Sequence, residues 1–180
     1  MDASRSALLN TRGLNLGSGP HYAEGWLNVD LHDPPEGCRS PDYFASVFDL
    51  TEHFPEDSFV AAYLGHFLEH LEWSRIPEAL AQVRAVCRPG ASVMAVGPCL
   101  YRAISTNQPR AILEAIVADP RQALDGHGHA WTPTTDLTRE ALEAGGLLHV
   151  ATVPIVGVTK PAWPNPTTAP WQTAAMGIVP

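Results

Sequence analysis

The chain is poor in cysteine. Only three of its 180 residues are cysteines, and Cys38, Cys87 and Cys99 form no C-x-x-C pair. This number and spacing argue against a disulfide framework and against a cysteine zinc site. Cys87 and Cys99 stand in apolar stretches, where core thiols are common. We therefore expect a reducing, cytoplasmic setting.

Basic residues and long apolar runs are also scarce. Eleven Lys and Arg against 19 Asp and Glu give a formal net charge of -8, so the chain lacks the basic footprint that binds phosphate backbones. Nucleic acid is therefore disfavoured as a partner. No apolar run approaches a membrane span, and residues 1–12 contain no signal-peptide core. We expect no membrane partner and one domain over residues 1–180, with residues 1–12 as a loosely held tail.

Two short apolar runs around a glycine turn are the most informative stretch. The sequence LNLGSGP occupies residues 14–20, and WLNVD occupies residues 26–30. A strand that ends at Gly17 and Gly19 lets the backbone come close to a ligand, and Asp30 at the end of the next strand can accept hydrogen bonds from a ribose diol. A plain turn is the alternative. The short span between the glycines and Asp30 predicts that the first helix is shortened or missing and that residues 22–26 form a loop over the ligand.

The rest of the chain alternates between strand and helix patterns. We expect further strands at residues 43–48, 59–64, 92–96, 147–158 with a break at Pro154, and 171–179. Helices are expected at residues 74–87, 109–118 and 137–144, the last capped by Asp136 and closed by Gly145 and Gly146. Residues 88–90 should form a turn. Alternating strands and helices are typical of an α/β protein with a mostly parallel sheet.

Five segments, in order, resemble the class I S-adenosylmethionine-dependent methyltransferases, in particular their small single-domain bacterial type. They are LNLGSGP, WLNVDL, FDLTEHFPEDSFVAAYLGHFLEHL, AQVRAVCRPGASVMAVGP and DLTREALEAGGL, within residues 13–146. The resemblance implies a Rossmann-like, seven-stranded, mostly parallel sheet with flanking helices and a final antiparallel strand. It also implies S-adenosyl-L-methionine as the cofactor.

The same resemblance assigns positions around that cofactor. The glycine loop would lie under its methionine part, Asp30 with Leu31 beside its ribose, and Asp49 with Leu50 near its adenine. His66 would lie where the family's fourth motif approaches cofactor and substrate. The cofactor-binding set is therefore Gly17, Ser18, Gly19, Asp30, Leu31, Asp49, Leu50 and His66. The chain departs from the family pattern twice, with His21 in place of a third glycine and Asn15 in place of an acid.

Histidines are the candidate catalytic residues. His66 is the first candidate for a general base, because a neutral imidazole accepts protons near pH 7, and His129 is the second. A lining role for His66, without proton transfer, is the alternative. His127 and His129 could also form a metal pair or a substrate contact, or be plain loop residues beside Trp131. His21 is a further candidate for contact with cofactor or substrate.

The segment HFLEH matches H-x-x-E-H, which on a helix presents two imidazoles as zinc ligands beside a glutamate. This would make the chain a metallopeptidase. The motif follows a strand and Gly65, however, rather than lying inside a long helix. In the favoured interpretation it begins the turn after the strand, Glu69 and His70 are structural or surface groups, and no metal is bound.

The sequence thus predicts a methyltransferase with a small or medium-sized acceptor, such as a sugar, a glycan end or another metabolite. The segments expected to cap the site, at residues 33–42, 100–108 and 119–133, are short and leave it open. A binding module that has lost catalysis is the alternative. A nicotinamide dehydrogenase is disfavoured, because the glycine turn lacks a helix whose N-terminus would bind a pyrophosphate.

Overall fold

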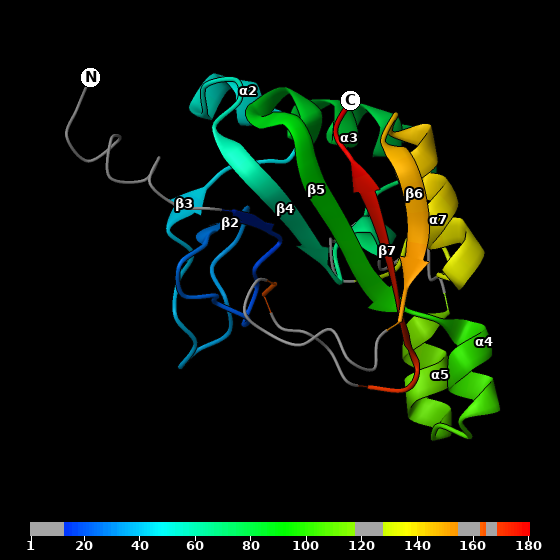
Figure 1. Ribbon diagram of the computed structural model, residues 1–180. Helices are drawn as coiled ribbons and strands as arrows, with labels where there is room; N and C mark the ends of the chain where they lie inside the picture. The colour runs from blue at the N-terminus through cyan, green and yellow to red at the C-terminus, as the bar shows by residue number, and fades with distance from the viewer. Residues whose placement is uncertain (1–12, 118–127, 155–162, 165–168) are drawn as a thin grey trace.

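Seven strands form one mixed sheet in the computed structural model, which describes residues 13–117, 128–154, 163–164 and 169–180 (Figure 1). Their spatial order is β3-β2-β1-β4-β5-β7-β6, and β7 runs antiparallel to both of its neighbours. This confirms the predicted Rossmann-like α/β fold with a final antiparallel strand. The strands are β1 Leu14–Leu16, β2 Leu27–Asp30, β3 Tyr43–Phe44, β4 Phe59–Gly65, β5 Cys87–Pro98, β6 Leu148–Val153 and β7 Gln172–Ile178.

Helices pack against one face of the sheet and at one end of it. In Figure 1, α3 and α7 lie behind the strands, while α4 and α5 lie beyond the carboxyl end of β5. The described helices are α2 Leu50–His53, η1 Leu68–His70, η2 Trp73–Arg75, α3 Ile76–Val86, α4 Leu100–Ser105, α5 Arg110–Ile116 and α7 Thr135–Ala144.

The main core lies between the sheet and α3. The spacing of Ile76, Leu80 and Val83 places these side chains on one helical face, and all three are buried. They meet the buried residues of β1 and β4. Burial of this apolar surface is the main term that stabilises the fold.

The opposite face of the sheet carries no helix among the described residues. The connection from β1 to β2, residues 17–26, consists of turns, which confirms the prediction for the first helix. Tryptophans pack on this face instead, since the rings of Trp26 and Trp163 are 5.6 Å apart and Trp163 lies 6.4 Å from the ring of Tyr63. Trp26 and Trp163 are thus packing aromatics.

Two predicted boundaries near the ends of elements were wrong. β3 spans two residues rather than residues 43–48, because the chain turns at Ser46, whose Oγ accepts a hydrogen bond from the Phe48 amide at 3.1 Å. The cap of α7 is Thr134, not Asp136, since Thr134 Oγ1 accepts from the Leu137 amide at 3.2 Å. Asp136 lies in the first turn of α7.

One predicted turn was also wrong. Residues 88–90 belong to β5, because Gly90, with φ +82°, bends the strand while its amide bonds to the carbonyl of Val179 at 2.9 Å. The segment at residues 100–108, expected to cap the site, contains α4. The part of the predicted strand at residues 155–158 lies outside the described residues. No helix in the described part of the chain is long and apolar enough to cross a membrane.

Candidate functional site

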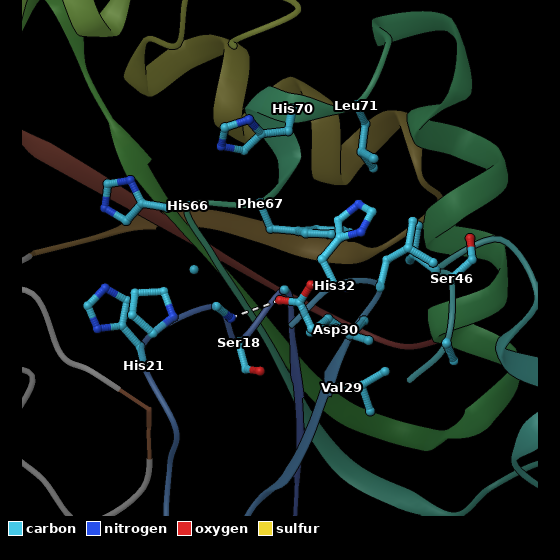
Figure 2. Close-up of a pocket in the computed structure, with 18 of the residues that line it drawn as sticks. Ser18, His21, Val29, Asp30, His32, Ser46, His66, Phe67, His70 and Leu71 are labelled. Carbon is cyan, nitrogen blue, oxygen red and sulfur yellow. Dashed lines mark hydrogen bonds between the residues drawn. The ribbon is translucent and has the colours of Figure 1, made fainter. Parts of the chain in front are cut away.

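The carboxyl ends of β1, β2 and β4 surround a cavity of about 490 Å³ (Figure 2). This position is the crevice where ligands bind in open α/β sheets, and the volume is that of a small-molecule site. Its lining comes from the glycine turn, the end of β2, the loop after β3 and the segment after β4: Leu16, Gly17, Ser18, Gly19, Pro20, His21, Val29, Asp30, Leu31, His32, Ala45, Ser46, Val47, Phe48, Gly65, His66, Phe67, His70 and Leu71.

The glycine turn has a backbone that only glycine adopts readily. Gly17 has φ +63° and Gly19 has φ +46°, in the left-handed region that other residues enter at a cost. A Cβ atom at Gly17 would also lie 2.4 Å from Cδ2 of Phe67, whereas a Cβ at Gly19 would meet nothing within 4 Å. Gly17 is thus required by both conformation and space, and Gly19 by conformation alone.

Asp30 connects β2 to this turn. Its Oδ2 accepts a hydrogen bond from the Gly19 amide at 2.8 Å, and its Oδ1 accepts one from the His32 amide at 3.1 Å. The bond to Gly19 is drawn as a dashed line in Figure 2. Each carboxylate oxygen can accept a second hydrogen bond. Asp30 is therefore positioned by the protein and still able to bind a diol.

Comparison with known proteins gives similarity in structure alone, since no protein-family model and no curated protein sequence matches the chain. A methyltransferase from Archaeoglobus fulgidus, described as S-adenosylmethionine-dependent, superposes with a TM-score of 0.58 at 16% identity, covering 97% of this chain and 90% of that one. The class I methyltransferase fold is present. An S-adenosylmethionine-dependent methyltransferase from Mesorhizobium loti has a TM-score of 0.52 at 18% identity over 98% and 95% of the two chains. Human N-acetylserotonin methyltransferase, solved in complex with S-adenosylmethionine, has a TM-score of 0.54 at 12% identity over 98% and 51%.

Most of the cofactor positions expected for a methyltransferase fold meet at the cavity. Gly17, Ser18, Gly19, Asp30, Leu31 and His66 all line it. Asp49 and Leu50 do not, because Leu50 is fully buried at the start of α2 and Asp49 Oδ1 lies 3.6 Å from His53 Nε2. The loop at residues 45–48 lines the cavity in their place.

His66 is held on both sides of its ring. It has φ +51°, directly after β4, a strained conformation that often marks a functional position. Its Nδ1 lies 3.4 Å from Glu69 Oε1, and its Nε2 lies 2.5 Å from the side-chain nitrogen of Gln172. Both ring nitrogens of His66 therefore face protein partners.

His21 lies beside His66 on one side of the cavity (Figure 2). Burial lowers the pKa of His21 below its ordinary value, and repulsion from His66 lowers it further. The imidazole of His21 is therefore neutral at pH 7. Its place directly after the glycine turn was the signal that made it a candidate.

His129 lies outside the cavity lining, with its Nδ1 3.0 Å from the carbonyl of Ile116. His127 lies outside the described residues. Trp131 packs its loop onto the body as expected, with 9% of its surface exposed. Sequence reasoning missed Phe67, His70 and Leu71, which line the cavity because they follow β4 directly.

The H-x-x-E-H motif does not lie on one helix. His66 precedes η1, while Glu69 and His70 belong to it. Glu69 is buried with 2% of its surface exposed, so it is no surface group. The described residues instead place Glu69 and His70 beside His129, with one possible ligand atom of each within 4.8 Å of the others, and His66 is not in this group. The helical zinc-peptidase arrangement is therefore not formed.

Proposed function

We propose that this protein is an S-adenosylmethionine-dependent methyltransferase. The observation that carries the proposal is the Asp30 carboxylate, held by the Gly19 amide at 2.8 Å at the mouth of the cavity. In this fold the crevice at the carboxyl ends of the strands binds the ligand. A carboxylate there, with oxygens able to accept further hydrogen bonds, suits the two hydroxyls of a ribose.

The residues of the cavity fit the cofactor part by part. The turn of Gly17 and Gly19 brings the backbone close enough to accommodate its amino-acid end, and Asp30 would hold its ribose. The apolar side chains of Val47, Phe48 and Leu71 line the cavity and would pack against its adenine. When bound, the cofactor supplies a methyl group on a positively charged sulfur, which is a good leaving group.

The protein then has to position the acceptor, and fixing two reactants in line can contribute about 7–11 kcal/mol to the barrier reduction. We propose that His21 accepts the proton of a hydroxyl or amine acceptor, because its imidazole is neutral at pH 7 and lies in the cavity. His66, between Glu69 and Gln172, would orient the acceptor or, if Gln172 moves aside, accept the proton itself. His129 does not line the cavity and is not proposed as the base.

The proposed acceptor is a small or medium-sized molecule, such as a sugar, a glycan end or another metabolite. A cavity of about 490 Å³ must hold the cofactor and leave room for the reacting end of the acceptor. The net charge of -8 does not favour a nucleic-acid acceptor.

Calorimetric titration with S-adenosylmethionine and S-adenosylhomocysteine tests this proposal. We expect micromolar binding, equivalent to about 8 kcal/mol, and a loss of at least tenfold in Asp30→Ala. The matched control is Asp33→Ala, which removes an exposed carboxylate three positions away that does not line the cavity. Absence of binding to the wild-type chain, or equal binding by Asp30→Ala, would overturn the proposal.

A binding module without turnover is the second candidate. It is favoured by the two departures around the glycine turn, Asn15 in place of an acid and His21 in place of a glycine. Incubation with S-adenosylmethionine and a panel of hydroxyl, amine and carboxylate acceptors separates the two functions. Release of S-adenosylhomocysteine with any acceptor supports the enzyme, whereas binding without release across the panel supports the module.

A further inference from the structure

A buried carboxylate with one oxygen that makes no hydrogen bond within the described part of the chain lies beside the cavity. Glu69 has 2% of its surface exposed, and its Oε1 makes no hydrogen bond among the described residues. Burying a charged group is costly unless a counter-charge or a metal ion compensates it. The imidazoles of His70 and His129 are its neighbours, with ligand atoms of all three residues within 4.8 Å of one another.

Both imidazoles are held in the orientation that metal-binding histidines adopt. His70 Nδ1 lies 3.1 Å from the carbonyl of Gly128, and His129 Nδ1 lies 3.0 Å from the carbonyl of Ile116. A carbonyl oxygen only accepts, so in each neutral ring the proton is on Nδ1 and the lone pair is on Nε2. Metal-ligating histidines usually donate their second ring nitrogen to a carbonyl or carboxylate in this way.

The two segments that carry these groups are fastened together. The Ala130 amide donates to the carbonyl of Glu69 at 2.7 Å, and Nε1 of Trp131 donates to the carbonyl of Leu68 at 3.1 Å. His129 is therefore fixed next to η1, and its ring centroid lies 5.1 Å from that of His70. Residues about 60 positions apart in the chain thus form a prearranged group.

We propose that Glu69, His70 and His129 bind a divalent transition-metal ion on the wall of the cavity. Two imidazoles and one carboxylate are a ligand set that suits Zn²⁺ and neighbouring first-row ions. Ligand atoms about 2.1 Å from one tetrahedral ion lie about 3.4 Å apart. The three groups, now within 4.8 Å of one another, therefore need to draw together by up to about 1.4 Å, a movement that side-chain rotation can supply.

The position of the ion follows from His70, which both belongs to this group and lines the cavity. Three protein ligands leave at least one coordination position open, as in catalytic zinc sites. We assign that position to an oxygen atom of the acceptor, which the ion would hold beside the methyl group. This assignment rests on the proposed methyltransferase function, whereas the binding of the ion does not.

The competing role for Glu69 is an ion pair with His66, whose Nδ1 lies 3.4 Å from Glu69 Oε1. In that case His70 and His129 would be loop-packing residues with no ion between them. The two roles differ in one measurable respect, because an ion pair needs only His66 whereas a metal site needs His129.

Titration of the untagged, chelator-treated chain with ZnCl₂ decides between them. We expect one Zn²⁺ per chain, and binding weakened about 100-fold or more in Glu69→Gln and in His129→Ala. If Glu69→Gln fails to fold because it changes a buried residue, His129→Ala still tests the site. Thermal unfolding verifies that each variant folds. The matched control is His149→Asn, an exposed histidine on β6, which should bind as the wild type does. Substitution with Co²⁺ should give visible absorption bands that are lost in both variants.

Two results would overturn the metal site: no stoichiometric Zn²⁺ binding by the wild type, or binding that both variants retain. Titration of the same preparations with S-adenosylmethionine keeps the two proposals separate. Cofactor binding without Zn²⁺ binding overturns the metal site alone. Zn²⁺ binding without cofactor binding supports the metal site and overturns the proposed function.

Discussion

Asn15 donates a hydrogen bond from Nδ2 to Oδ1 of Asn28 at 2.8 Å, and both side chains are buried. The two residues are direct neighbours in the register of β1 and β2. The bond orients Asn28, whose Nδ2 donates to the carbonyls of Ala23 and Trp26 at 3.0 Å each. This asparagine pair holds the loop that stands in place of the first helix. Asn15, a departure from the family pattern, thus has a structural role.

Asn15→Leu should lower the free energy of unfolding by about 1–3 kcal/mol, because it removes one partner of a buried polar group. Asn15→Asp should also destabilise the protein, since an ionised carboxylate cannot donate to Asn28 Oδ1. Urea denaturation at pH 7 measures both effects. A change below about 0.5 kcal/mol, the usual size for surface substitutions, would contradict this role.

Gly17 and Gly19 form a matched pair for substitution. Gly19→Ala should cost only the left-handed conformation, about 1–2 kcal/mol, because a Cβ there meets nothing within 4 Å. Gly17→Ala adds a contact of 2.4 Å with the Phe67 ring, so it should destabilise the protein more and displace a wall of the cavity. Urea denaturation and cofactor titration of both variants test this order, and equal effects would refute it.

The pKa of His21 should depend on its neighbour His66. Its pKa is lowered first by burial and then by His66, so His66→Asn should move the pKa of His21 back toward its ordinary value. Because the folded-state pKa lies below the unfolded value of 6.5, this group's contribution to stability is complete above pH 6.5. It is lost as the pH falls through the lowered pKa. NMR titration of the imidazole checks this, with His149→Asn as the control, and a pKa at or above 6.5 in the wild type would contradict it.

The cysteines should differ sharply in reactivity. Cys38 is exposed, while Cys87 and Cys99 are buried, and burial raises the pKa of Cys87 to about 12. The thiolate is the reactive form. At pH 8 iodoacetamide should therefore modify only Cys38 in the folded protein and all three cysteines in urea, as mass spectrometry would show. Cys38→Ser should remain unmodified when folded, and modification of Cys87 in the folded chain would show that the core opens there.

Periodicity predicted the elements that have a long apolar run or a regular apolar face. β4 is a continuous apolar run and α3 has an apolar face, so both were predicted to within about two residues. The antiparallel final strand was not derivable from periodicity and came from the resemblance, while the order of the strands was not predicted. Hydrogen bonds of single side chains set the remaining boundaries. Ser46 ends β3 and Thr134 caps α7, and such bonds depend on tertiary position.

The candidate site was predictable where it follows the strand ends. Gly17, Asp30 and His66 all stand directly after or at the end of a strand, and all line the cavity. Asp49, whose position near the adenine came from the resemblance, does not line the cavity. The group of Glu69, His70 and His129 could not be predicted from spacing, since the fold alone brings His129 to η1.

The position of β7 between β5 and β6 has a consequence for the order in which the sheet can assemble. β5 pairs with β7 along Ser92–Pro98, and β6 pairs with the other side of β7. Synthesis makes β7 after every other described strand, so one edge of β5 stays open and β6 has no strand partner until β7 pairs with both. Pairings this distant in sequence are slow to form, and unpaired edges invite association with other chains. The sheet therefore closes only when β7 inserts between β5 and β6, two strands that are made before it.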